Sequence, residues 1–281
     1  MSETVESLRH KIDSATELGS VVRTMKALAA SSIAQYERAV ISLDDYYHTV
    51  ELGLVACLQS QNAVKAYQPS PKSLCVVVFG ADQGLAGQYN EVLADFVVAN
   101  LKGNTLEKHV FVVGERIQGY LADFGIEKIF AAPNSIAAIT GITGRILSAI
   151  DSDQVYLFHN KPQADSAYEP VMQRLLPLDE TWQGELLRQQ WPSRNLPEVI
   201  GMGTLEALIR EYIFISLFRA ATESLASENA ARLNAMRRAE KNIDELLDAL
   251  KQDFHHLRQT GIDEELFDVI AGYELLAGSG R

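Results

Sequence analysis

The chain has 281 residues, of which 47% are hydrophobic and 22% are charged, the composition of a folded, soluble protein. Its formal net charge of −12 argues against nucleic-acid binding and against adhesion to anionic lipid through a broad basic face. Its two cysteines, Cys57 and Cys75, lack CxxC spacing, which disfavours a disulfide framework or a zinc site. We therefore expect a reduced, cytosolic setting and no metal or other cofactor.

The N-terminal residues show no targeting signal. The first 20 residues carry Glu3, Glu6, Asp13 and Glu17 and have no apolar core, so we expect no signal peptide. The chain also has no apolar run long enough for a membrane-spanning helix. If the protein takes part in a membrane process, we expect it to act from the aqueous side of the membrane.

Residues 1 to about 60 contain no proline and predict one long helix. Small or apolar residues recur there every three or four positions, the spacing of a coiled-coil seam. We expect only a local loosening at Gly19. The seam residues are Val5, Leu8, Ile12, Ala15, Val22, Met25, Ala29, Tyr36, Val40, Leu43, Tyr47, Val50 and Leu54.

The middle of the chain, 70–197, has a different pattern, and all eight prolines lie between Pro69 and Pro197. Short, valine-rich apolar runs alternate with helical stretches, which predicts a mostly parallel, Rossmann-like sheet covered by helices. The expected strands are 73–80, 109–114 and 154–160, with an additional edge strand at 171–178. The expected helices are 88–102, 115–124 and 136–150, and 191–198 is expected to be a linker.

The loop GADQGLAGQYN (80–90) lies between an expected strand and an expected helix, a position where phosphate-binding loops occur. Its glycines, Gly80, Gly84 and Gly87, fit neither GxGxxG nor a P-loop. Two interpretations stay open. One is nucleotide binding, and the other is a tight turn that uses the backbone freedom of glycine.

The last part of the chain, 198–281, predicts a second long helix. From Thr204 to Thr260 there is no glycine or proline, which at the rise of an α-helix spans roughly 85 Å. Gly261 is expected to end this helix and Asp263 to start another. The seam residues are Ala226, Ala230, Leu233, Met236, Ile243, Leu247, Leu250, Phe254 and Leu257. We expect the two terminal helices to pair as an antiparallel coiled coil.

Chemistry-bearing clusters are not apparent. His255 and His256 are adjacent and so point in different directions on a helix, which disfavours a metal site. No nucleophile–base pair stands out. Arg23 and Lys26 flank Met25 in the N-terminal seam, which by itself indicates only a solvated helix face.

Four stretches together are similar to the gamma subunit of F-type ATP synthases. KIDSATELGSVVRTMKALAASS (11–32) is similar to that family's opening helix, and ADQGLAGQYN (81–90) resembles its S-D-x-G-L-C-G-x-x-N loop. ASENAARLNAM (226–236) resembles A-S-E-x-A-A-R-M-x-A-M, and LRQTGIDEELFDVIAGYELL (257–276) resembles the family's C-terminal motif. The stretches occur in the family's order, in a chain of similar length.

The resemblance implies a central rotor shaft without an active site of its own, whose coiled coil turns inside the hexamer of alpha and beta subunits. Small side chains, such as those of 226–236, would suit a close-fitting sleeve. Carried onto matching positions, the contacts with the beta subunits would come from these residues: Arg23, Met25, Lys26, Arg258, Gln259 and Glu265.

The resemblance also implies a foot, made of the α/β domain, that packs against the epsilon subunit and the ring of c subunits. The matching loop positions are Asp82, Gly84, Leu85, Gly87 and Asn90. The chain would then lie at the cytoplasmic face of the inner membrane and meet the membrane only through the Fo sector.

Some positions depart from the family pattern. Arg23 and Ser32 stand where the family usually has lysine. Ala86 stands at a cysteine position of the family, and Asp263 at a position where threonine is common. A second, divergent rotary ATPase, such as a sodium-translocating one, is therefore an alternative to a main synthase. Two other functions stay open: a non-rotary scaffold or tether with a coiled-coil stalk, and a nucleotide-dependent enzyme that uses the α/β domain.

Overall fold

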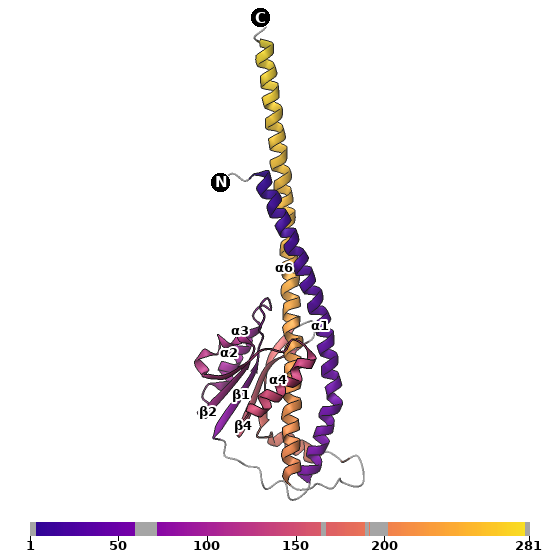
Figure 1. Ribbon diagram of the computed structural model, residues 1–281, viewed down its shortest axis with the longest axis vertical. Helices are drawn as coiled ribbons and strands as arrows, with labels where there is room; N and C mark the ends of the chain where they lie inside the picture. Colours follow the sequence, from indigo (N-terminus) through magenta and orange to yellow (C-terminus); the bar gives the residue numbers. More distant parts are fainter. Residues whose placement is uncertain (1–3, 60–71, 164–166, 189–190, 192–201, 279–281) are drawn as a thin grey trace. The chain divides into compact units, whose positions relative to one another are not determined.

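The computed structural model describes residues 4–59, 72–163, 167–188, 191 and 202–278 (Figure 1). Two helices, α1 (Val5–Gln59) and α6 (Met202–Gly278), contain most of the helical residues. Apart from Trp191, the expected linker 191–198 lies outside the described residues. The division of the chain near residues 60, 70 and 197 stays a prediction, because these boundaries fall in or beside such segments.

A five-stranded sheet occupies the middle of the chain, in the order β3-β2-β1-β4-β5. The first four strands are parallel, with Ser73 opposite Glu107 and Leu74 opposite Gln154, and β5 runs antiparallel to β4 at one edge. The mostly parallel sheet and its additional edge strand are therefore as predicted. The strands are β1 (Ser73–Phe79), β2 (Glu107–Val113), β3 (Ile126–Phe130), β4 (Gln154–Pro162) and β5 (Tyr168–Leu176).

Both faces of the sheet are covered, which explains the continuous apolar run of β1. Alternate residues of β1 enter two different cores. Leu74, Val76 and Val78 pack with α2 and α3, whereas Cys75, Val77 and Phe79 pack with α1, α4 and α6. The covering helices are α2 (Tyr89–Leu101), α3 (Glu115–Gln118) and α4 (Ile136–Ala149). Two further elements are a 3₁₀ turn (Ala122–Phe124) and α5 (Glu180–Arg188).

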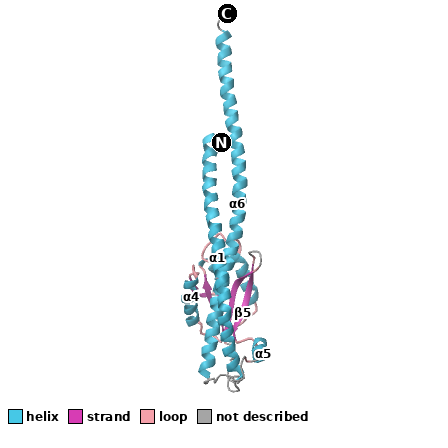
Figure 2. Cartoon of the chain, turned by 90° about the vertical axis from the view of Figure 1, so that its right-hand side faces the viewer, coloured by secondary structure: helices cyan, strands magenta, loops and turns pink. Residues whose placement is uncertain are grey.

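The chain forms two compact units, one of Met1–Leu28 with Ala235–Arg281 and one of Ala29–Asn234. In the second unit, the sheet and the adjoining parts of α1 and α6 pack together, and these two helices run antiparallel (Figure 2). Arg219 of α6 lies 3.2 Å from Asp44 of α1, and Leu208, earlier on α6, lies against Gly53, later on α1. The predicted fold, an α/β domain with a pair of antiparallel terminal helices, is confirmed.

In the first unit, the beginning of α1 and the later part of α6 also pair antiparallel. Val22, Met236 and Ile243 are buried in one apolar cluster. Gly19 lies inside α1 without a break, so the expected loosening is wrong. A Cβ at Gly19 would touch the Cγ2 atom of Ile243 at 3.4 Å, so glycine here permits a close approach of the two helices.

Further elements differ from the prediction. The expected helix 115–124 is only a short helix, Glu115–Gln118, followed by a separate 3₁₀ turn. Helix α6 continues through Gly261 to Gly278, so neither the break at Gly261 nor the new start at Asp263 occurs. A single glycine costs a helix only about 1 kcal/mol, which the helical residues on both sides outweigh. Strand β3 and helix α5 were not predicted, since the polar edge strand IEKIF lacks the apolar run used to find the others.

Candidate functional site

The first set of predicted contact residues lies on α1 in the smaller unit. Arg23 is exposed, and Met25 packs against the cluster of Val22, Met236 and Ile243. The ammonium group of Lys26 lies 2.5 Å from the carboxylate of Glu240 on α6, so this lysine is already engaged within the chain. Arg23 is therefore the charged residue of this set that is open to another molecule.

The second set, Arg258, Gln259 and Glu265, lies on α6 and is exposed throughout. Arg258 is 18 residues further along α6 than Glu240, the partner of Lys26, which is roughly 27 Å along a helix. The structure therefore places the two sets at separate levels of the helix pair rather than in one patch.

The glycine loop is held by its own polar side chains. The carboxylate of Asp82 accepts hydrogen bonds from the backbone N–H of Glu115 at 2.7 Å and of Ala132 at 2.9 Å. Asp82 therefore ties together the chain segments that follow β1, β2 and β3. The side-chain oxygen of Asn90 accepts from the N–H of Ala81 at 3.0 Å. The side chains of Asp82 and Asn90 thus bond the loop to itself and to the neighbouring segments, and this favours the tight-turn interpretation over nucleotide binding.

The backbone of the loop uses left-handed conformations at two positions, Leu85 with φ 65° and Gly87 with φ 61°. The Leu85 side chain is 60% exposed. Gly84 lies against the guanidinium group of Arg116, which a Cβ would approach to 3.0 Å. Of the predicted loop residues, Leu85 is therefore the one with a large side chain available to a partner.

The same end of the sheet carries the junction with α6. Tyr89 is buried, and its hydroxyl lies 2.9 Å from the carbonyl oxygen and 2.7 Å from the hydroxyl of Ser224. The Ser224 hydroxyl donates to the carbonyl of Phe79, and that of Ser227 donates to the carbonyl of Asn160. Burial raises the pKa of the Tyr89 phenol, so it stays protonated and able to donate.

This junction changes the interpretation of the motif ASENAARLNAM (226–236). Residues 226–233 are all buried within the chain, so their small side chains do not face outward to a sleeve. They are small because α6 is enclosed here by other parts of the same unit. Ala231, for example, packs with Ala81, Ala86 and Tyr89 of the glycine loop.

Two charged residues of the motif form a buried ion pair beside a cavity of about 430 Å³. Arg232 and Glu228 lie 2.5 Å apart, four residues apart on α6. Burial raises the pKa of Glu228 in spite of the opposing effect of Arg232, and the charge of Asp82 raises it further. The Nε atom of Arg232 is buried without a hydrogen-bond partner. The pair fixes the cavity wall between α1, α6 and the strand ends.

The described residues contain no group of three or more His, Cys, Asp or Glu side chains placed to hold a metal ion. No helix in the described ranges has the length and apolarity that crossing a membrane requires.

Comparison with known proteins identifies the family. An ATP synthase gamma chain of Pasteurella multocida is 28% identical over 285 residues, which covers 95% of this chain and 97% of that protein. A gamma chain of Anaeromyxobacter is 26% identical over 296 residues, covering 97% and 99%. The family model described as ATP synthase matches residues 4–276. The chain belongs to the ATP synthase family, among its gamma chains.

Solved structures agree with the fold of this gamma-chain family member. A chain of the Euglena gracilis mitochondrial ATP synthase rotor matches with a TM-score of 0.65 and 14% identity, covering 92% of this chain and 98% of that one. A chain of the Tetrahymena thermophila mitochondrial ATP synthase central stalk and c ring matches with a TM-score of 0.59 and 22% identity, covering 78% and 99%.

Several residues that organise this gamma-chain structure were missed from the sequence. Tyr89, Asn160 and Ser227 join the loop, the sheet and α6. Glu228 and Arg232 lie inside the motif ASENAARLNAM, but the resemblance implies no role for them. Their spacing of four residues is a signal for an ion pair on one helix face.

Proposed function

We propose that this chain is the central rotor shaft of an F1 ATPase and couples ion flow through Fo to ATP synthesis or hydrolysis on the beta subunits. The observation that carries the proposal is the gamma-chain family membership, which extends over residues 4–276. Within each unit α1 pairs with α6, as a two-helix shaft requires.

The last part of α6 supports a contact with the hexamer of alpha and beta subunits. A group of large apolar side chains is 46–71% exposed there, although such residues normally gain from burial. Arg258, Gln259 and Glu265 lie on the same segment and would add directional hydrogen bonds in a charge-poor environment. The apolar residues are Ile262, Leu266, Phe267, Val269 and Ile270.

A second contact with the beta subunits would lie on α1 around Arg23 and Met25. Leu18, Val21 and Leu28 are 55–64% exposed beside them, so this part of α1 also offers an apolar surface. At each angle of the shaft, these two surfaces would touch the three beta subunits differently. Each beta subunit would then be biased toward a different affinity for nucleotide, because a bound partner shifts a protein only through differential contacts.

The chain would act as a non-catalytic subunit of an ion-translocating ATP synthase, with the reacting sites on the beta subunits. The α/β domain would form the foot that meets the epsilon subunit and the c ring, at the cytoplasmic face of the inner membrane. Leu85 is the large apolar side chain of the glycine loop that is offered to such a partner, since Asp82 and Asn90 are engaged inside the chain.

The test is purification of the tagged full chain from its own host, with mass spectrometry of the proteins that come with it. Alpha and beta subunits with ATPase activity are the expected result, and their peptide sequences would separate a main synthase from a second rotary ATPase. A Leu266→Asp variant should lose the hexamer, whereas the control Leu187→Asp, on the exposed surface of α5, should keep it. Recovery without hexamer subunits would contradict the proposal and favour a scaffold.

A further inference from the structure

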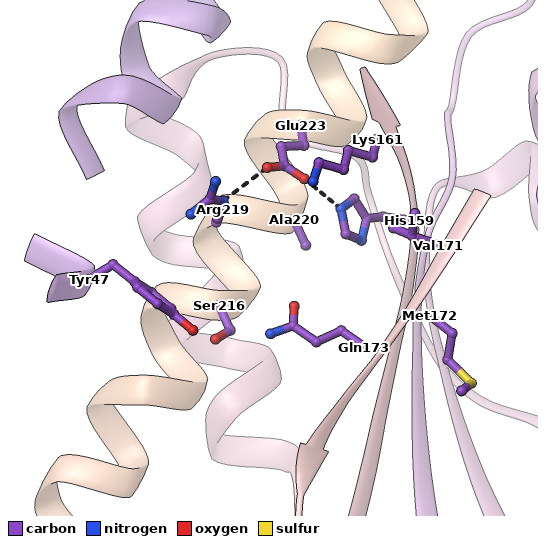
Figure 3. A pocket seen from close by; sticks show the side chains of 10 residues that line it. All are labelled: Tyr47, His159, Lys161, Val171, Met172, Gln173, Ser216, Arg219, Ala220 and Glu223. Atoms are coloured by element: carbon purple, nitrogen blue, oxygen red, sulfur yellow. Dashed lines mark hydrogen bonds and ion pairs between the residues drawn. The ribbon is translucent and has the colours of Figure 1, made fainter. Parts of the chain in front are cut away.

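A chain of polar contacts connects β4, α6 and α1 in the larger unit. Figure 3 shows its part from His159 through Glu223 to Arg219. His159 Nε2 of β4 lies 2.8 Å from Glu223 Oε2 of α6. Arg219, one turn earlier on α6, donates from Nε to Glu223 Oε1 at 2.9 Å. The same guanidinium group donates from Nη1 to Asp44 Oδ1 of α1 at 3.2 Å. One guanidinium and one carboxylate thus link three separate elements.

The centre of this chain of contacts is buried, and its position on the sheet is fixed. His159 is 4% exposed and Glu223 is 5% exposed. His159 lies in an inner strand, opposite Phe79 of β1 and Val171 of β5, so the backbone that carries it is held from both sides. Burial alone would raise the pKa of Glu223, but the hydrogen bonds from His159 and Arg219 outweigh it and lower the pKa. The carboxylate is therefore ionised at neutral pH.

A cavity of about 300 Å³ lies beside these contacts, bordered by α1, β4, β5 and α6. Lys161 of β4, Gln173 of β5 and Tyr47 of α1 line it together with Arg219 and Glu223 (Figure 3). Around the cavity, apolar residues of α1, the sheet and α6 pack in one core. The polar contacts beside the cavity add directional links between the same elements.

We propose that Glu223 and Arg219 are positioning residues that lock α6 to β4 and α1, so that the three elements turn as one body under load. This inference rests on the proposed rotor function. The hydrophobic effect that packs these elements together is itself non-directional. Charge-assisted hydrogen bonds have defined distances and angles and therefore oppose such sliding. If α6 moved relative to β4 and α1, part of the rotation of the c ring would not reach the hexamer.

The test measures coupling in the whole complex, reconstituted in vesicles, for Arg219→Gln and Glu223→Gln. Glu223→Gln keeps the side-chain size and removes the charge. Arg219→Gln removes the charge and the guanidinium group that contacts both Glu223 and Asp44. Arg174→Gln is the matched control, because its ion pair with Asp179 at 3.4 Å lies in the same unit and touches neither α1 nor α6. The readout is the ratio of ions transported to ATP hydrolysed, with transport followed as proton uptake and as sodium uptake.

We expect the ratio to fall by about twofold or more in the two variants, with assembly and hydrolysis retained and the control unchanged. Asp44→Asn, at the exposed end of the contacts, should give a smaller loss and is the safer variant for folding. An unchanged ratio, or a parallel fall in hydrolysis and transport, would overturn the proposal. A wild-type chain that brings no hexamer with it would instead refute the rotor function itself.

Discussion

Removing one buried hydroxyl should measurably weaken the junction between the sheet and α6. Tyr89→Phe deletes the hydroxyl that is shared between the carbonyl and the side chain of Ser224. Ser224 keeps its own hydrogen bond to the carbonyl of Phe79, so no buried polar group is left without a partner. The loss should therefore equal one net hydrogen bond, about 1 to 1.5 kcal/mol of the free energy of unfolding.

For a unit of this size, that loss corresponds to a fall in Tm of roughly 2 to 6 °C. Thermal unfolding of the full chain, followed by circular dichroism, measures it. Tyr120→Phe is the matched control. This tyrosine is 54% exposed, so removing its hydroxyl should cost little stability. The control should change the Tm by much less than Tyr89→Phe does.

A double-mutant cycle tests the assignment to Ser224 directly. If the hydroxyls of Tyr89 and Ser224 interact, Tyr89→Phe and Ser224→Ala should be non-additive by at least about 0.5 kcal/mol. Additive effects, or a Tm of Tyr89→Phe equal to that of the Tyr120→Phe control, would refute the view that this contact holds α6 to the sheet.

Four other outcomes are expected. The difference in unfolding free energy between the wild type and Glu223→Gln should be full above pH 4.5, the ordinary pKa of the carboxyl group. It should vanish as the pH falls through the lowered pKa of Glu223 in the folded state, and unfolding curves recorded across pH would show this. Gly261→Ala should stabilise α6 by about 0.5–1 kcal/mol, seen as slower local hydrogen exchange, because no atom lies within 4 Å of the new methyl. Gly114→Ala should instead lower the Tm, since Gly114 has a φ of 107° and its Cβ would lie 2.8 Å from the backbone nitrogen of Ala81. Deleting residues 262–281 should reduce hydrolysis and hexamer recovery but leave epsilon and c-ring binding, and loss of the latter would contradict the placement of the foot.

The sequence alone determined the elements that depend on local pattern. The valine-rich run 73–80 predicted a strand buried on both faces, and its residues do alternate between two cores. The seam spacing predicted two long helices that bury one stripe each, and Leu8, Ala15, Val22, Ala29 and Tyr36 are buried at intervals of seven residues. These features are readable because the period of an apolar pattern is a property of neighbouring residues.

The tertiary structure decided what the local pattern left open. The alanines of 226–236 suit either an external sleeve or a helix enclosed within the chain, and only the fold shows that Ala226, Ala230 and Ala231 are buried. Gly261 has a low helix propensity, yet it is helical because the helix-forming residues on both sides of it outweigh its cost. The hydrogen bonds of Asp82 and Tyr89, and the contact between His159 and Glu223, join residues 33 to 135 positions apart, and a periodicity of three or four residues carries no information about such partners.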